Sequence, residues 1–511
     1  MPVNKKIQRK TTILAKVLGS NWFFAFIVAF FLFQMIWIAL SAIYPMLFDE
    51  EYHLGIIDIY SRQILPFIHT QPPEAAFHGD ITRYGSYMFH YLMGVPYYLI
   101  NLFTNDLQTI VIAMRLICIS FVIGGLFVFR AFLLRAGLTK SLTNLAIGFF
   151  TVIPLVPFAL SQINYDSLAF LLTATIFYLA IRAIENSKKQ ALWLILLLAI
   201  SSVASLVKFT ILPIAFASVL FVAIILWRKY KNKTFSTLAK QAKKTPKFFM
   251  IISVLVLLVG IGLFVERYGV NVIKYHAIEP KCDQVHSDDS CIQYTVWRRD
   301  TTWKQNNDNA NVVRNNPLVY TTTYWAPHIF GDFTVTAAFV YKDSRELEIR
   351  YLPSGPGSMQ ASAGAPILRY GSWFVLVASI IAISVTWKKL PNRRLRYLVL
   401  LTLAIYASSL WLRNYSDYLN IGAGTAAQGR YFISLLIPIF AVIGLAFRHL
   451  IVRMRYQVMF LVVALLLVSQ GGGLANYILY SNSKWYWPDN RQTITQINKS
   501  TNKFLRLFIY P

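Results

Sequence analysis

The carboxylates that open the first long polar stretch are the first candidates for chemistry. Asp49, Glu50 and Glu51 are consecutive, directly follow an apolar run, and have His53 two residues further on. Carboxylates in such a position can act as general bases or hold a divalent cation. The stretch continues with many Pro, His and aromatic residues, a composition suited to binding. The alternative is a solvated acidic loop start, which is common.

A second acid, Asp166, stands in a short polar turn, residues 161–167, between two apolar runs. An ionisable residue between two membrane spans is a functional candidate. The alternative is a helix N-cap, because Asp166 precedes the apolar run 168–180. The two roles are compatible.

Three cations lie at positions where membrane spans are expected to end or turn. Lys208 is at the centre of the long apolar run 191–227, and Arg413 and Arg430 bracket the short polar stretch 413–429. Phosphate binding is one reason for such cations, and arginine favours bidentate contact with phosphate. The alternative is that these side chains reach toward lipid headgroups.

His328 lies in an aromatic segment, residues 324–332 (YWAPHIFGD), within a long polar stretch. An imidazole there can be a ligand or a substrate contact. The alternative is a surface histidine in an aromatic loop.

The composition indicates how these residues are positioned. Of 511 residues, 56% are hydrophobic and 14% are charged, against roughly 25% charged in a typical soluble domain. The apolar runs 21–43, 248–265 and 456–479 reach the ~17–25 residues of a spanning helix, and only helices satisfy every backbone polar group there. The net charge of +27 does not indicate nucleic-acid binding. The basic residues lie between apolar runs, as topology signals and contacts for anionic lipid.

Charge asymmetry then predicts the topology. The clustered Lys and Arg lie in six segments, which the positive-inside rule places in the cytoplasm: residues 1–20, 130–140, 182–190, 228–247, 388–396 and 448–455. The run 21–43 is too long for a signal-peptide core, so it is expected to be an uncleaved first span. The alternation predicts about eleven spans, near residues 21–43, 109–130, 141–160, 168–184, 190–206, 209–227, 248–265, 370–387, 396–412, 430–447 and 456–479. The N-terminus is then cytoplasmic and the C-terminus outside.

This topology predicts an all-α polytopic membrane protein with large outer loops. The N-terminal transmembrane module is residues 1–265 and includes a first outer loop, 44–108, in which 84–103 suits a re-entrant or interfacial helix better than a span. A large outer loop, 266–369, ends in a Gly/Pro/Ser cluster at 353–366. C-terminal helices, 370–479, and an outer tail, 480–511, follow. Cys282 and Cys291 lie in the large loop, on the oxidising side, and a disulfide or free thiols are the alternatives.

The order of these motifs resembles the GT-C superfamily of membrane glycosyltransferases. Within that superfamily, it resembles the protein O-mannosyltransferase and aminoarabinose-transferase-like enzymes of glycosyltransferase family 39. The outer loop opening at residues 49–55 (DEEYHLG) is similar to the mannosyltransferase loop start, and the Pro-Pro step at 72–73 follows in the same loop. Asp166 and Lys208 match an acid and a lysine in short outer turns. Residues 428–432 (QGRYF) resemble a step in related membrane proteins of unassigned function. One departure is Gln71-Pro72-Pro73-Glu74, where the family often has Lys-Pro-Pro-Leu.

The resemblance implies an enzyme that transfers a sugar from a polyprenyl-phosphate donor to a glycan, lipid or protein acceptor on the outer face, with inversion. It implies Asp49 as the base or positioning group, with Glu50 and Asp166 completing an acidic pocket. A divalent ion held by Asp49 and Asp166 is the cofactor that it suggests. The residues expected to contact substrates are His53, Lys208, His328, Arg413, Arg430 and Tyr431.

Three other functions compete with this one. A transporter or flippase of lipid-linked saccharides would place its binding residues near the bilayer midplane, whereas the acids here lie at span ends. A surface-polysaccharide polymerase or ligase would share the donor and differ only in the acceptor. A structural scaffold leaves the acidic pocket unexplained. The expected location is the bacterial plasma membrane.

Overall fold

The fold is that of a computed structural model, and the residues that it describes are 13–46, 49–185, 189–334, 337–341, 347–351, 365–451, 455–469, 472–480, 486–505 and 507. Most of the Gly/Pro/Ser cluster at 353–366 lies outside these residues, as does the start of the N-terminal basic segment.

Long apolar helices form the body of the molecule. The helices at the eleven positions expected to cross the membrane are α2 (Asn21–Ser41), α5 (Leu107–Arg135), α6 (Lys140–Thr151) with α7 (Leu155–Leu160), α8 (Tyr165–Ile184), α9 (Gln190–Val207), α10 (Ile211–Tyr230), α12 (Lys247–Phe264), α19 (Ala365–Thr386), α20 (Arg393–Ile421), α21 (Ile433–Leu450), and α22 (Arg455–Ser469) with α23 (Leu474–Tyr480). Within the described residues, eight helices are long and apolar enough to cross a membrane, and two shorter apolar helices cover Trp373–Thr386 and Tyr456–Val468.

Side-chain caps and prolines explain several of these boundaries. Ser20 caps α2 by accepting a hydrogen bond from the Phe23 amide, at 3.0 Å, and Asp106 caps α5 through the Thr109 amide, at 2.8 Å. The expected span 141–160 is divided into α6 and α7 at Val152–Pro154, because proline lacks the amide that a continuous helix needs. The run 191–227 forms two helices, as expected, with Lys208 at the turn.

The loops that are expected to lie outside the membrane are largely helical. Their elements are α3 (Glu50–Ser61), η1 (Pro73–His78), α4 (Met88–Asn101), η3 (Val265–Gly269), α13 (Val270–Tyr275), α14 (Cys282–Val285), α15 (Asp288–Cys291), α16 (Thr295–Asn309), α17 (Pro317–Tyr320), η4 (Thr321–Trp325), α18 (Ala326–Thr334), η5 (Gly429–Phe432), η7 (Pro488–Asn490) and α24 (Arg491–Leu505). Two short antiparallel strands, β1 (Ala337–Tyr341) and β2 (Leu347–Tyr351), pair with Ala337 opposite Tyr351. The remaining elements, η2 (Lys231–Lys233) and α11 (Thr234–Lys244), follow α10 in a basic segment.

The length of α4 and the end of α20 bear on two expectations about the outer regions. Helix α4 has 14 residues, so it is about 21 Å long and too short to cross a ~30 Å hydrocarbon core. The third outer loop is shorter than the expected 413–429, because α20 continues to Ile421. Arg413 therefore lies within a helix, two turns before its end.

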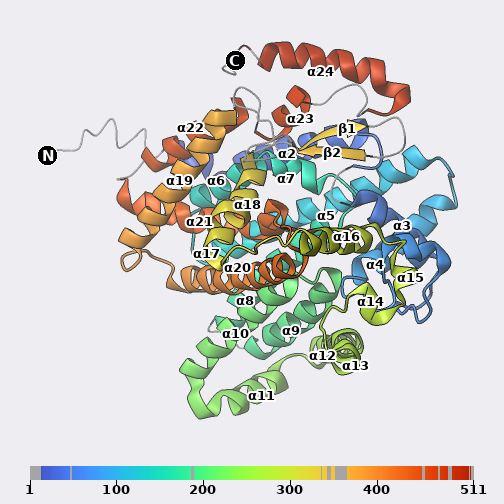
Figure 1. The fold of residues 1–511 in the computed structure, drawn as a ribbon. Helices are drawn as coiled ribbons and strands as arrows, with labels where there is room; N and C mark the ends of the chain where they lie inside the picture. Colours follow the sequence, from blue (N-terminus) through green and yellow to red (C-terminus); the bar gives the residue numbers. More distant parts are fainter. Residues whose placement is uncertain are drawn as a thin grey trace, which may run out of the picture.

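The basic segments and the candidate site lie at opposite ends of the bundle. At one end, the Asn144 side chain donates to the Leu18 carbonyl, at 2.8 Å, and the Gln457 amide donates to the Ser141 hydroxyl, at 3.2 Å. Figure 1 shows α19 and α22 on the left and α3, α4 and α15 on the right. The basic end is the one that the positive-inside rule predicts to be cytoplasmic.

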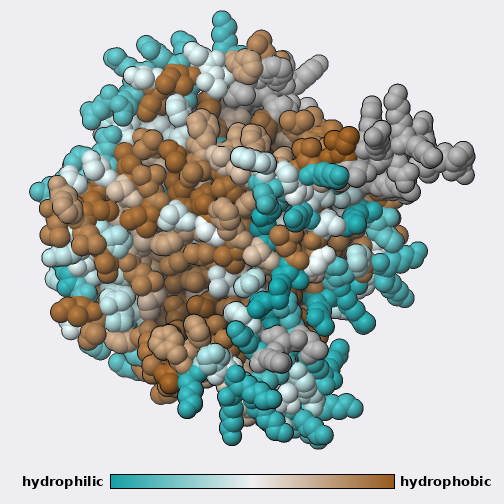
Figure 2. Space-filling view, turned by 180° about the vertical axis from the view of Figure 1, so that it is seen from behind, coloured by the Kyte–Doolittle hydropathy of each residue, from teal (hydrophilic) through white to brown (hydrophobic). Residues whose placement is uncertain are grey.

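The surface has the pattern of a protein embedded in lipid. Figure 2 shows a broad hydrophobic band between hydrophilic side chains at either side. Helix α12 contributes exposed Phe248, Leu255 and Val259, while packing on α9. A contiguous exposed apolar belt of this size is unusual for a soluble protein. With eight candidate spans among the described residues, the chain is a polytopic membrane protein.

Candidate active site

Asp49 has an unusual backbone conformation, at the end of the bundle opposite the basic segments. It precedes α3 with φ 70° and ψ 27°, in the left-handed region, and its side chain does not cap the helix. Aspartate adopts this region more readily than most residues, yet at some cost. Arg430 Nη2 donates to Asp49 Oδ2 at 2.9 Å. The Asp49 side chain is 55% exposed and that of Arg430 is 5% exposed, so a buried cation holds an accessible carboxylate.

A second ion pair joins Asp166 and Lys208. Asp166 lies in the first turn of α8, and the side chain of Asn164 caps that helix by accepting from the Asp166 amide, at 2.9 Å. The expected N-cap role for Asp166 is therefore wrong, because Asn164 fills it and frees the aspartate to pair with Lys208. Both side chains are almost fully buried. Burial lowers the pKa of Lys208, Arg430 lowers it further, and Asp166 opposes the shift.

Aromatic rings connect the two ion pairs. Lys208 Nζ lies 4.7 Å from the centroid of the Tyr165 ring and 5.0 Å from that of the Tyr431 ring. The guanidinium carbon of Arg430 lies 5.6 Å from the Tyr431 ring. Attraction between cations and ring faces is strengthened away from water. Tyr431 thus lies next to both cations, and the four charges form one cluster.

His53 lies one helical turn after Asp49 and packs against Tyr165 beside this cluster. Its ring meets the Tyr165 ring edge to face, with centroids 4.5 Å apart, and its Nδ1 is 2.9 Å from Nε2 of His90 on α4. Burial lowers the pKa of His53 well below its ordinary value, with contributions from His90, Arg430 and Lys208. Burial also lowers the pKa of His90, to about 3. Both imidazoles are therefore neutral at physiological pH.

Two buried polar atoms of the cluster lack a partner. Within the described part of the chain, neither His53 Nε2 nor Asp166 Oδ2 has a hydrogen-bond partner. Buried polar atoms are nearly always paired, so each unpaired atom needs an explanation. Hydroxyl groups of a bound substrate would supply one.

Glu50 has a different position from Asp49. Its carboxylate is fully buried and accepts from Arg115 Nε at 2.8 Å and from Arg115 Nη2 at 2.7 Å. It also accepts from the amides of Met46 and Ile163, at 2.6 and 3.0 Å. These four bonds occupy both oxygens, which favours positioning over proton transfer. The amide of Ile163 lies in the turn that leads to Asp166, so Glu50 joins the segments that carry the two aspartates.

Arg413 lies in α20 and pairs with a residue that the sequence did not single out. Its Nη1 is 2.8 Å from Glu279 Oε2, and its guanidinium carbon is 5.5 Å from the Phe209 ring, next to Lys208 in the chain. Charge from Glu279 contributes to raising the pKa of Tyr84 and of Tyr294, after the larger effect of burial in each case. The ring of Tyr84 lies 6.3 Å from that of Tyr52, three residues after Asp49, so Tyr84 is beside the charged cluster.

His328 has another set of contacts. Its Nδ1 is 2.7 Å from the Tyr324 carbonyl, and the two rings lie 4.1 Å apart. Helix α18, which carries His328, packs on η5, which carries Arg430. The structure places His328 in a layer next to the cluster, and its expected contact with substrate stays a prediction.

The sequence reasoning missed Arg115, Glu279, Tyr294 and His90. Arg115 has a clear signal, because it is a charge inside the apolar run of α5, where ionisable residues require partners. Glu279 and Tyr294 carry no comparable signal, since their importance depends on how the large outer loop folds back. Gln71, where the chain departs from the family pattern, stabilises its own loop: it donates to Gly79 O at 2.7 Å and accepts from the Ile81 amide at 3.2 Å.

The side chains expected to hold a divalent ion are the carboxylates of Asp49 and Asp166. Asp49 and Asp166 each pair with a cation already. Among the residues that the structure describes, no group of three His, Cys, Asp or Glu side chains is arranged to hold a metal ion. Hard cations favour six or more oxygen ligands, which these residues do not supply by themselves. A divalent ion stays an expectation from the resemblance, and no chemical step is assigned to it.

Comparisons with known proteins find distant similarity to solved structures. No protein-family model and no curated protein matches the chain. The fold is similar to the archaeal oligosaccharyltransferase AglB from Archaeoglobus fulgidus, solved in complex with an inhibitory peptide and a dolichol-phosphate. The TM-score is 0.40 and the sequence identity 11%, over 96% of this chain and 60% of that one. The chain thus spans less than two thirds of that protein's length.

Proposed function

We propose that this protein is a membrane glycosyltransferase that moves a sugar from a polyprenyl-phosphate donor to an acceptor hydroxyl on the outer face, with inversion at the anomeric carbon. The observation that carries the proposal is the pairing of the accessible Asp49 carboxylate with the buried Arg430, next to the Lys208–Asp166 pair. A base beside two buried cations suits a reaction in which a hydroxyl loses a proton while a phosphate leaves.

Asp49 is proposed as the base. Arg430 holds one of its oxygens, and the exposure of the side chain leaves room for an acceptor. The acceptor oxygen forms a bond to the anomeric carbon as the bond from that carbon to the phosphate oxygen breaks. The proton of the hydroxyl passes to Asp49, and the electron pair of the broken bond leaves with the lipid phosphate. Attack from the side opposite the phosphate inverts the anomeric carbon.

Arg430 and Lys208 are proposed to stabilise the phosphate. Both are buried at the ends of membrane helices, where a lipid-linked phosphate can reach them from the bilayer. A guanidinium can contact two phosphate oxygens, and the lysine adds a point charge. Because both cations are fixed before the reaction, they stabilise the charge that develops on the leaving oxygen.

The unpaired polar atoms provide sites for the sugar. His53 Nε2 and Asp166 Oδ2 are buried, and the His53 ring packs on Tyr165, the residue before Asp166. Hydrogen bonds from the hydroxyls of the donor sugar would satisfy both atoms. The Tyr165 ring offers a flat face of the kind that stacks on sugar rings.

The test is transfer of radiolabelled sugar from polyprenyl-phosphate donors in membranes that contain the wild type, Asp49→Asn or Glu51→Gln. Glu51 is an exposed neighbouring carboxylate, so Glu51→Gln is the matched control. We expect Asp49→Asn to lower transfer about a hundredfold or more, the usual contribution of a general base, and Glu51→Gln to transfer at the wild-type rate.

Two outcomes would contradict the proposal. Equal transfer by Asp49→Asn would remove Asp49 from the reaction. A wild type that releases no sugar from any donor would contradict glycosyl transfer, and translocation of the same lipids in vesicles would then identify a flippase. The chemical class of the labelled product distinguishes a protein, lipid or polysaccharide acceptor.

A further inference from the structure

The segment 276–294 of the large outer loop is closed on itself by a disulfide. It connects α13 to α16 and contains the two short helices α14 and α15. Cys282 and Cys291, one in each short helix, form the disulfide. His276 ends α13 with φ 53°, which turns the chain back toward the first outer loop. The segment is thus a compact unit.

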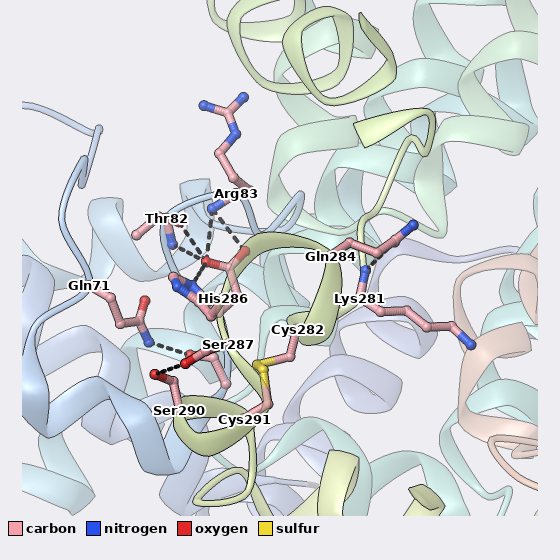
Figure 3. Close-up of a disulfide and its surroundings, with 12 residues drawn as sticks. Gln71, Thr82, Arg83, Lys281, Cys282, Gln284, His286, Ser287, Ser290 and Cys291 are labelled. Carbon is pink, nitrogen blue, oxygen red and sulfur yellow. Dashed lines mark hydrogen bonds and ion pairs between the residues drawn. A yellow bond between two sulfur atoms is a disulfide. The ribbon is translucent and has the colours of Figure 1, made fainter. Parts of the chain in front are cut away.

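One side of this unit is attached to the first outer loop. His286 Nε2 lies 2.9 Å from Asp80 Oδ1, and Asp80 also accepts from the Thr82 and Arg83 amides. Figure 3 shows Gln71, Thr82 and Arg83 beside His286, with the disulfide below them. Burial opposes ionisation of Asp80, but its hydrogen bonds with His286 and Thr82 lower its pKa overall. The attachment therefore has the character of a charge-assisted contact.

The other side of the unit is attached to α20. Glu279 pairs with Arg413 at 2.8 Å, and Lys281 Nζ lies 3.9 Å from Asp417 Oδ1. The segment therefore bridges the first outer loop and the end of a membrane helix.

These attachments bring Tyr294 to the charged cluster. Its ring packs directly on Gly79, at a position where a Cβ would meet ring atoms. Gly79 has φ +84°, so both its backbone conformation and this contact favour glycine. Burial raises the pKa of Tyr294, and the charges of Asp49 and then Glu279 raise it further. The ring of His78, next to Gly79 in the chain, lies 5.7 Å from the ring of Tyr52, three residues after Asp49, so the contact with Gly79 places Tyr294 near Asp49. Even so, the Tyr294 side chain is only half-buried.

We propose that the disulfide-closed segment forms the acceptor side of the site, and that Tyr294 binds the acceptor next to Asp49. The inference rests on the proposed glycosyl transfer. The donor reaches Arg430 and Lys208 from the bilayer, because both residues lie at ends of membrane helices. Tyr294 comes from the outer loop, on the side away from the bilayer, and a water-soluble or surface-bound acceptor must approach from there. Its phenol can donate or accept a hydrogen bond, and its ring offers an apolar face.

The experiment measures how the transferred sugar partitions between acceptor and water. Membranes are incubated with radiolabelled polyprenyl-phosphate sugar, and acceptor-bound label is compared with free sugar released by hydrolysis. A residue that binds the acceptor affects transfer more than hydrolysis. The ratio of the two products does not depend on how much protein folds, so a partly unfolded variant remains informative.

Four variants are compared with the wild type. We expect Tyr294→Ala to lower the ratio of transfer to hydrolysis about tenfold, equivalent to ~1.4 kcal/mol, because the contact with the acceptor is lost. Tyr294→Phe gives an intermediate ratio, since it keeps the ring and removes the hydroxyl. Cys282→Ser/Cys291→Ser lowers the ratio in the same direction. Ile292→Ala, an exposed neighbour in the same segment, retains the wild-type ratio.

The outcomes separate the two proposals. If Tyr294→Ala partitions sugar as the wild type does, even with both products reduced, Tyr294 is structural and the inference is overturned. If the wild type releases no sugar to acceptor or water, the proposed function itself fails. A lowered ratio in Tyr294→Ala with a wild-type ratio in Ile292→Ala supports both.

Discussion

Glu50 and Arg115 form a completely buried ion pair, with Arg115 Nη2 2.7 Å from Glu50 Oε2 and both side chains 0% exposed. Arg115 also donates to the backbone carbonyls of Ala39 and Ala42, at 3.0 and 2.5 Å, at the end of α2. The pair therefore fixes α2, α3, α5 and the turn before α8 relative to one another. The adjacent acids therefore have different roles. Asp49 is accessible to a substrate, whereas Glu50 is buried and holds the helices together.

Removal of one partner of this pair should destabilise the protein strongly. We expect Glu50→Gln or Arg115→Met to lower the free energy of unfolding by about 3–5 kcal/mol, because the remaining charge is left buried without its partner. Thermal unfolding in detergent measures the effect. The control is Asp58→Asn, which breaks the exposed pair of Asp58 with Arg62 and should cost under ~1 kcal/mol. Similar losses for both pairs would contradict this account. The double variant Glu50→Gln/Arg115→Met should cost less than the two single changes together.

Two substitutions of Asp49 can distinguish the role of its backbone conformation from the role of its carboxylate. Asparagine tolerates the left-handed region at least as well as aspartate, whereas a β-branched residue does not. We expect Asp49→Asn to change stability by less than ~1 kcal/mol, and Asp49→Val to lower it by about 1–2 kcal/mol or more. Both variants should lose sugar transfer. A stable Asp49→Val protein would show that the conformation at φ 70° is not maintained in the variant.

Arg430 should not be replaceable by lysine. A lysine keeps the charge but loses the planar group that can contact Asp49 and a phosphate together. We expect Arg430→Lys to raise the KM for the polyprenyl-phosphate donor about tenfold, equivalent to ~1.4 kcal/mol, and to lower kcat as well. Arg299→Lys changes an exposed outer arginine paired with Asp300 and should leave both constants unchanged. A donor KM that does not move in Arg430→Lys would place the phosphate elsewhere.

Because His90 and His53 are buried and neutral, we expect the free energy of unfolding to depend on pH. The pKa of His90 is lowered to about 3 from an ordinary 6.5, mainly by burial. Between those values the unfolded chain binds a proton that the folded chain does not. Stability is therefore complete above pH ~6.5 and falls as the pH drops, by up to ~1.4 kcal/mol per pH unit for each such histidine. His53, whose pKa is also lowered, adds to the effect.

Unfolding temperatures at pH 7.5 and 5.5 test this expectation. His90→Gln should flatten the decrease, because glutamine does not titrate. His69→Gln, which changes an exposed histidine, should leave the decrease as it is in the wild type. A decrease that is equally steep in His90→Gln would mean that other groups cause it.

The sequence by itself determined the membrane helices and the end at which the chemistry gathers. Apolar runs of spanning length must be helical in lipid, and helices occur at all the expected positions. The split at Lys208 followed from length alone, because the run 191–227 is too long for one span. Asp49, Asp166, Lys208 and Arg430 were identifiable because charges at span ends are rare and each needs a reason.

Only the tertiary structure decided which charges meet. Asp49 and Arg430 are 381 positions apart in the chain, and no local pattern encodes that pairing. Glu50 and Asp49 have the same side-chain chemistry and adjacent positions, yet one faces Arg115 inside the bundle and the other is accessible, because a helix begins between them. Tyr294 and Glu279 depend on how the disulfide-closed segment folds back on the first outer loop. Such contacts depend on packing between distant segments, whereas helix formation in a membrane depends on the local apolar run.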